Sequence, residues 1–183
     1  TSDSGLAVSL AVIVPADLGK SVATLRSLNV KDDAEQRRTT REISGSVRGD
    51  GTSPAFTAIG FTADEKAELD KLLRAKPGDD FNFSKEELAW VGQAAASGVE
   101  PAQAAAGVMR RVLESRYLAY RKAGLAGLPP YARSGGKQVS PGAELAATTE
   151  AMPLVRKQLP DFYQAYRNYP KVGAEGLQHR FFW

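Results

Sequence analysis

The stretch VEPAQAAAGVMRRVLESRYLAYRKAGLAGLPPYARSGGK, residues 99–137, holds the longest helical pattern of the chain and its densest mixture of arginine and tyrosine. Pro101 suits a first helical position, because its missing N–H would have no helical partner there in any case. No further proline follows until Pro129, and Gly124 comes directly after a basic last turn, where a glycine often ends a helix. The sequence therefore predicts a helix over Pro101–Ala123.

This predicted helix has an apolar side and a charged side. At about 100° per residue, the apolar side comprises Ala105, Val108, Met109, Val112, Ala119, Tyr120 and Ala123. The charged side comprises Arg110, Glu114, Arg121 and Lys122. Such a division is typical of a helix that packs one face on a core, so we expect the charged side to face solvent.

Arg116 interrupts the apolar side, because it lies one turn from both Val112 and Tyr120. An unpaired buried charge costs several kcal/mol, so the guanidinium needs an ionic partner or a wet cavity. One interpretation is a structural ion pair with Glu144 or Asp161 from the following helices, which is the more common arrangement.

The other interpretation is a ligand site, since the planar fork of Arg116 suits a carboxylate or phosphate. Three nearby side chains complete the candidate ligand-binding set, namely Tyr120, Tyr131 and Arg133. The implied partner is a small anionic ligand or a protein of unknown identity. Nucleic acid is disfavoured, because the basic residues of this region point around the helix and Glu114 lies among them.

The first third of the chain mixes strand and helix signals. Residues 6–14, LAVSLAVIV, are rich in β-branched residues and predict a buried strand, with an apolar helix start as the alternative. Residues 16–29 carry leucine and valine at helical spacing. Residues 43–48 and 56–61 alternate loosely around Asp50-Gly51, which suits a tight turn, so they predict a β-hairpin.

From residue 62 onward the signals are helical. Thr62 with Glu65, and Ser84 with Glu87, each form the pattern of a capping box at the start of a helix. Further helices are expected after Ser140-Pro141, with an interruption at Pro153, and from Pro160; residues 125–137 read as a loop.

The predicted fold is α+β and predominantly helical, with an N-terminal strand and β-hairpin packed against four or five helices. We expect one domain over residues 1–183, in which residues 1–61 are mixed and residues 62–183 are helical and end in a short strand. The last seven residues, LQHRFFW, either dock as an edge strand or lead into a longer natural chain, and we favour the second reading.

The amino-acid composition excludes several classes of protein and of chemical site. Of the 183 residues, 43% are hydrophobic and 25% charged, with a net charge of +3, which is typical of a globular protein and too weakly basic to indicate nucleic acid. The absence of cysteine excludes disulfides, thiolate catalysis and cysteine-held metal. The longest uninterrupted apolar run, residues 10–14, is far short of the ~20 residues of a membrane helix.

Three motifs that could carry chemistry have simpler explanations. Gly19-Lys20-Ser21 lacks the earlier glycine of a phosphate-binding loop, because that position is Val14. His179 is the single histidine and has no G-x-S-x-G partner, so we expect a packed ring. The acidic pairs at residues 79–80 and 86–87 fit turns and helix caps. We therefore predict no catalytic residue, metal ligand or cofactor.

Two segments resemble a family of uncharacterised exported bacterial proteins: GLAGLPPYARSGGK at residues 124–137 and HRFFW at residues 179–183. The resemblance spans roughly residues 78–183. It implies a periplasmic or secreted location, with a cytoplasmic one as the alternative, and a missing C-terminal part. It implies no activity.

The function that these observations favour is a non-enzymatic binding or accessory protein, with a pocket or contact surface near the central helix. An enzyme that uses carboxylate or tyrosine side chains is the second hypothesis, and a basic nucleic-acid-binding module is the third.

Overall fold

The computed structural model describes residues 16–27, 41–175, 177 and 179–183. The chain divides into two compact units, Thr1–Thr40 and Arg41–Trp183. The division into these two units does not test the expectation of a single domain, which stays a prediction. The predicted strand over residues 6–14 lies outside the described residues.

In the first unit, the described residues form helix α1, Leu18–Ser27. The carboxylate of Asp17 accepts the backbone N–H of Lys20 at 3.0 Å, which satisfies one of the unpaired donors of the first turn. Gly19-Lys20-Ser21 therefore belongs to the start of a helix, as expected.

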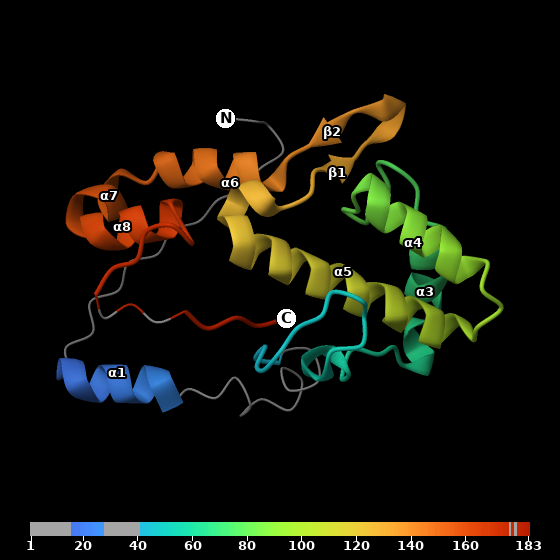
Figure 1. The fold of residues 1–183 in the computed structure, drawn as a ribbon, viewed down its shortest axis with the longest axis horizontal. Coiled ribbons are helices and arrows are strands. Elements are labelled where there is room, and N and C mark those ends of the chain that lie inside the picture. The colour runs from blue at the N-terminus through green and yellow to red at the C-terminus, as the bar shows by residue number, and fades with distance from the viewer. Residues whose placement is uncertain (1–15, 28–40, 176, 178) are drawn as a thin grey trace. The chain divides into compact units, whose positions relative to one another are not determined.

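The second unit is predominantly helical with one small antiparallel sheet, which confirms the predicted fold class (Figure 1). Its α-helices are α3 (Lys66–Leu73), α4 (Lys85–Ala95), α5 (Pro101–Ala123), α6 (Pro141–Glu150), α7 (Pro153–Gln158) and α8 (Pro160–Arg167). The sheet pairs β1 (Tyr131–Ala132) with β2 (Gln138–Val139). Short 3-10 turns η1 (Pro54–Phe56), η2 (Ala63–Glu65), η3 (Gly124–Gly127) and η4 (Ser134–Gly136) join the longer elements.

Local signals placed most helix starts correctly. The Glu65 side chain accepts the backbone N–H of Thr62 at 2.6 Å, directly ahead of α3. The second capping box is complete, since Glu87 accepts the backbone N–H of Ser84 at 2.7 Å and donates its own backbone N–H to the serine hydroxyl. Helix α5 has the predicted bounds, and Gly124 ends it with a positive φ of 61°.

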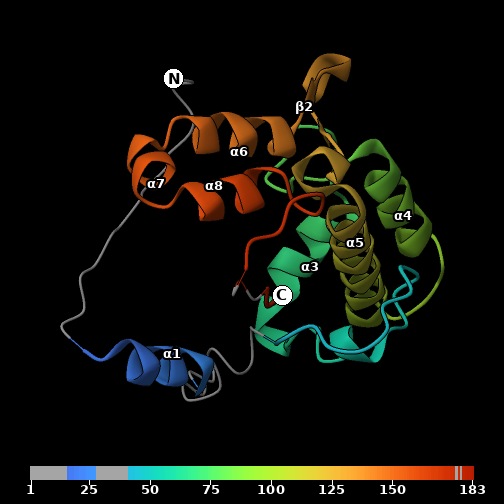
Figure 2. The same ribbon diagram turned by 60° about the vertical axis from the view of Figure 1, so that its left-hand side comes forward.

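The core of the second unit lies where α3 and α4 pack on α5, and Figures 1 and 2 show α4 alongside α5 in both views. Its buried residues are Leu69, Leu72, Phe83, Val91, Ala105, Val108 and Val112. The C-terminal end of α5 continues into η3, against which α6 packs. Helix α5 thus contacts α3 and α4, and its C-terminal end leads into η3, which packs on α6.

The predicted hairpin over residues 43–61 is wrong. The described segment from residue 41 to residue 53 forms bends and irregular structure, and residues 54–56 form η1. The reason lies at Gly49 and Gly51, whose φ angles of 88° and 87° turn their N–H groups towards the Glu114 side chain instead of across a strand ladder. The small hairpin of the fold is β1–β2, within a region predicted as loop.

The C-terminal residues pack as an extended segment beside residues 41–43, which agrees with the alternative in which they dock as an edge strand. An isolated antiparallel bridge joins Glu42 to Phe182, and Arg41 and Trp183 exchange backbone hydrogen bonds of 3.0 Å. The Trp183 indole also donates a hydrogen bond of 2.8 Å to the carbonyl of Ala55. The continuation of the natural chain stays a prediction.

Val112 offers a direct test of the packing of α5, because its side chain is 0% exposed. We expect Val112→Ala to lower the free energy of unfolding by about 1–3 kcal/mol, since it removes buried methyl groups and leaves a cavity. Val172→Ala is the control, because Val172 is 40% exposed. Chemical denaturation measures both, and equal small changes would place this face of α5 in solvent.

Candidate functional site

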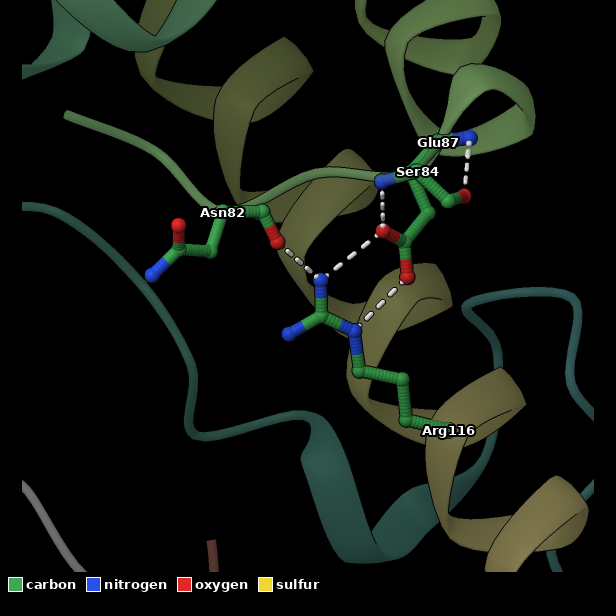
Figure 3. Close-up of polar contacts among 4 residues, drawn as sticks. All are labelled: Asn82, Ser84, Glu87 and Arg116. Carbon is green, nitrogen blue, oxygen red and sulfur yellow. Dashed lines mark hydrogen bonds and ion pairs between the residues drawn. The ribbon is translucent and has the colours of Figure 1, made fainter. Parts of the chain in front are cut away.

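Arg116 forms a bidentate ion pair with Glu87, which joins α5 to the start of α4 (Figure 3). The Nε–Oε1 distance is 2.7 Å and the Nη2–Oε2 distance is 2.8 Å. Nη2 also donates a hydrogen bond of 2.6 Å to the backbone carbonyl of Asn82. The Glu87 side chain is 2% exposed and that of Arg116 is 23% exposed, so the pair is largely shielded from water.

Glu87 has two structural tasks at once. Its Oε2 accepts both Nη2 of Arg116 and the backbone N–H of Ser84, the capping residue of α4. Burial alone would lower the pKa of Arg116, but the hydrogen bond and the negative charge of Glu87 outweigh it and raise that pKa. Arg116 therefore keeps its positive charge at neutral pH although it is largely buried.

The structure corrects the expected partner of Arg116. Glu144 and Asp161 were predicted, but both are exposed and neither forms an ion pair with it. The physical reason is the capping box of α4, which already brings the Glu87 carboxylate back over Ser84 and leaves its outer edge facing α5. A structural ion pair, the more common of the two arrangements, is the one observed.

Tyr131 and Arg133 lie beside this pair, at the small β1–β2 hairpin. The guanidinium carbon of Arg116 is 5.3 Å from the centroid of the Tyr131 ring, and that of Arg133 is 5.6 Å from it. Both distances are within the range of a cation–π contact. Nη2 of Arg133 also donates a hydrogen bond of 2.7 Å to the side-chain oxygen of Asn82. Three of the four predicted residues are thus brought together.

The two arginines differ in how their charges are balanced. Arg116 is neutralised by Glu87, whereas Arg133 forms no ion pair with any described residue. In Figure 3, Nη1 of Arg116 points away from both Glu87 and the Asn82 carbonyl. The cluster formed by Asn82, Glu87, Arg116, Tyr131 and Arg133, here called the Arg133 cluster, therefore carries one unbalanced positive charge.

Tyr120, the fourth predicted residue, belongs to a different group of rings near the C-terminal end of α5. Its ring stacks on Tyr169 at 5.0 Å between centroids and meets the edge of Phe181 at 6.2 Å. Burial, followed by the nearby Tyr166 and Tyr169 hydroxyls, raises the pKa of Tyr120 above its usual 10.0. The His179 ring lies beside the same group, 5.1 Å from that of Tyr169, but the residue is exposed, so the expectation of a packed ring holds only in part.

Sequence reasoning missed Glu114, which was placed on the solvated side of the helix. The side chain is 0% exposed and accepts three backbone N–H groups, from Gly49 at 3.0 Å, Gly51 at 2.9 Å and Ser53 at 2.8 Å. The loop of residues 48–53 wraps this carboxylate with its backbone. The G-D-G sequence at residues 49–51 is the signal that could have suggested such a loop.

Arg110 was also placed in solvent and is instead bonded to the same region of the chain. Its guanidinium donates to the carbonyl oxygens of Thr57 and Ile59, at distances from 2.6 to 3.1 Å. Together, Glu114 and Arg110 fasten residues 49–59 to α5. Both side chains therefore stabilise the fold, and the prediction that they face solvent is wrong for these two residues.

Other chemistries find little support in the described part of the chain. No group of three or more histidine, aspartate or glutamate side chains there is arranged to hold a metal ion. Asp79 accepts the backbone N–H of Lys76 at 2.8 Å, as expected of a turn residue. Among the described helices, none has the length and apolarity needed to span a bilayer.

Comparisons with protein-family models, with curated proteins and with solved structures found no match for this chain. The resemblance to exported bacterial proteins therefore stays a prediction. Inferences about function rest on the geometry above.

Proposed function

We propose that the protein is a non-enzymatic binding or accessory protein whose contact surface is the Arg133 cluster. The partner would present a carboxylate or phosphate, either as a small anion or as an acidic group on a protein. The exported location implied by the sequence resemblance belongs to the same proposal. A single observation carries it: Arg133 has a fixed position and a charge that no described residue neutralises.

The fixed position comes from two contacts. Asn82 accepts a hydrogen bond from Nη2, and the Tyr131 ring lies under the guanidinium. A guanidinium that is already oriented loses less conformational freedom on binding than a mobile one, so its remaining donors are available at lower cost.

The ion pair beneath this surface supports the proposal in a different way. Since Glu87 already neutralises Arg116, Arg116 acts as a rigid support for the Tyr131 ring, 5.3 Å from its guanidinium carbon. In the described part of the chain the buried carboxylates are Glu87 and Glu114, and the oxygens of both accept hydrogen bonds. A carboxylate held in this way is poorly placed to take a proton from a substrate, which favours binding over catalysis.

The proposal can be tested by titrating the ¹⁵N-labelled protein with inorganic phosphate at constant ionic strength and following backbone amide resonances. We expect saturable shifts centred on residues 131–136, and Arg133→Gln should weaken binding by about tenfold or more, because a charge-assisted hydrogen bond is lost. Arg156→Gln is the matched control, since Arg156 is exposed on α7. Equal affinities of wild type and Arg133→Gln, or shifts spread over all basic residues, would contradict the proposal.

A further inference from the structure

A second region of the protein has the features of a ligand site, independently of the Arg133 cluster. A groove of about 400 Å³ lies between α4, α5 and the Asp50-Gly51 turn. Its walls are largely apolar and include Trp90, Val99 and Val108. A groove of this size falls within the range of small-molecule sites in proteins.

Arg111 lies in the wall of this groove, and its guanidinium donates no hydrogen bond to a described residue. Its guanidinium carbon is 4.1 Å from the centroid of the Trp90 ring. Its Nε is shielded from water and has no hydrogen-bond partner among the described residues. Each of the other arginines of α5, Arg110, Arg116 and Arg121, donates at least one hydrogen bond to a described residue, and Arg111 donates none. Shielded polar groups of this kind are uncommon in folded proteins.

Gly107, also in the groove wall, keeps this space open. It lies in the interior of α5, where glycine weakens a helix relative to alanine. A Cβ added to it would meet no atom within 4 Å, so packing against the described residues does not require a glycine here. Without a side chain at Gly107, the wall of the groove has no projecting group at this position, one turn before Arg111 on α5.

The charges of the side chains that line the groove indicate which class of ligand it could bind. Arg111 would attract an anion, but Asp50 also lines the groove. Hydrogen bonds from the Thr52 side chain and backbone lower the pKa of Asp50, so its carboxylate is ionised at neutral pH. A doubly charged phosphate would be repelled by Asp50, whereas a single carboxylate on an apolar body matches one guanidinium and an apolar wall.

We infer that the groove binds a small apolar molecule that ends in one carboxylate, with its carboxylate on Arg111 and its apolar body on Trp90 and Val108. This chemistry is shared by medium-chain fatty acids and by apolar amino acids with a blocked amine. The inference does not rest on the Arg133 cluster, because it uses different residues and a different ligand.

The test follows the two indole N–H resonances, of Trp90 and Trp183, during titration with octanoate and, separately, with N-acetyl-leucine. We expect saturable shifts at Trp90 and none at Trp183. The matching amides, which lack the charge, should bind at least about tenfold more weakly than the carboxylates. Binding of octanoate alone would assign a fatty acid, and binding of N-acetyl-leucine alone an amino-acid carboxylate. No saturable shift with either carboxylate, or equal binding of acid and amide, would overturn the inference.

Two variants localise the effect. Arg111→Met should weaken carboxylate binding about tenfold while leaving the weak binding of the amide unchanged. Gly107→Leu should fill the groove and abolish binding without loss of stability, because its side chain enters open space. Gly92→Leu is the matched control, since Gly92 is an interior α4 glycine with equally open surroundings and does not line the groove. Unchanged binding by Gly107→Leu would place the ligand elsewhere.

Discussion

Replacing Glu114 with alanine should destabilise the protein by about 3–5 kcal/mol, more than the truncation of Val112 or the loss of the Arg116 charge. The substitution leaves three backbone N–H groups, of Gly49, Gly51 and Ser53, without their acceptor. Each buried donor left unsatisfied costs about 1–3 kcal/mol. The free energy of unfolding, measured in denaturant, reports the loss.

Glu114→Gln provides a milder version that should still fold. The amide keeps the side-chain volume and one oxygen acceptor, but its NH₂ group must face a backbone donor, so we expect a loss of about 2–3 kcal/mol. Glu175→Gln is the control, because Glu175 is exposed and should change stability by less than about 0.5 kcal/mol. If the Glu114 variants matched this control, the loop of residues 48–53 would not be held by the carboxylate.

Arg116→Met should lower stability by about 2–4 kcal/mol, because it leaves the carboxylate of Glu87 buried without its cation. The expected loss is somewhat smaller than for a fully buried pair, since the Arg116 side chain is 23% exposed. Arg156→Met is the control, because Arg156 is exposed and forms no ion pair with a described residue.

A double-mutant cycle separates the ion pair from other effects of these substitutions. Arg116→Met combined with Glu87→Gln should cost less than the sum of the two single changes, with a coupling energy of about 1–3 kcal/mol. Glutamine at residue 87 keeps an acceptor for the Ser84 N–H, so the capping of α4 is largely retained. Strict additivity, with Arg116→Met matching Arg156→Met, would mean that the pair contributes nothing to stability.

The sequence was most informative where a local signal determines the structure. Prolines at the first helical position mark the starts of α5, α6, α7 and α8. The helical period of the apolar residues also identified Arg116 as an inward charge, because Val112 and Tyr120 lie one turn on either side. These features depend on residues a few positions apart, so they can be predicted without tertiary information.

The sequence was least informative where distant segments meet. Glu114 is polar and lies on the charged side of the helical pattern, but backbone donors 61 to 65 residues away make its burial favourable. The helical pattern alone cannot show such donors. The partner of Arg116 also depends on a distant contact. Glu87 was identified as a capping residue, and its second role, as the partner of Arg116, depends on the packing of α4 against α5.

The central claim is that Arg116 is committed to its structural ion pair and that Arg133 is the charge left for a partner. The most direct measurement follows the side-chain Nε–H resonances of both arginines while inorganic phosphate is added. We expect the Arg133 resonance to shift and saturate, while the Arg116 resonance stays in place because its Nε is held by Glu87 at 2.7 Å. A saturable shift of Arg116 with no change at Arg133 would contradict this claim.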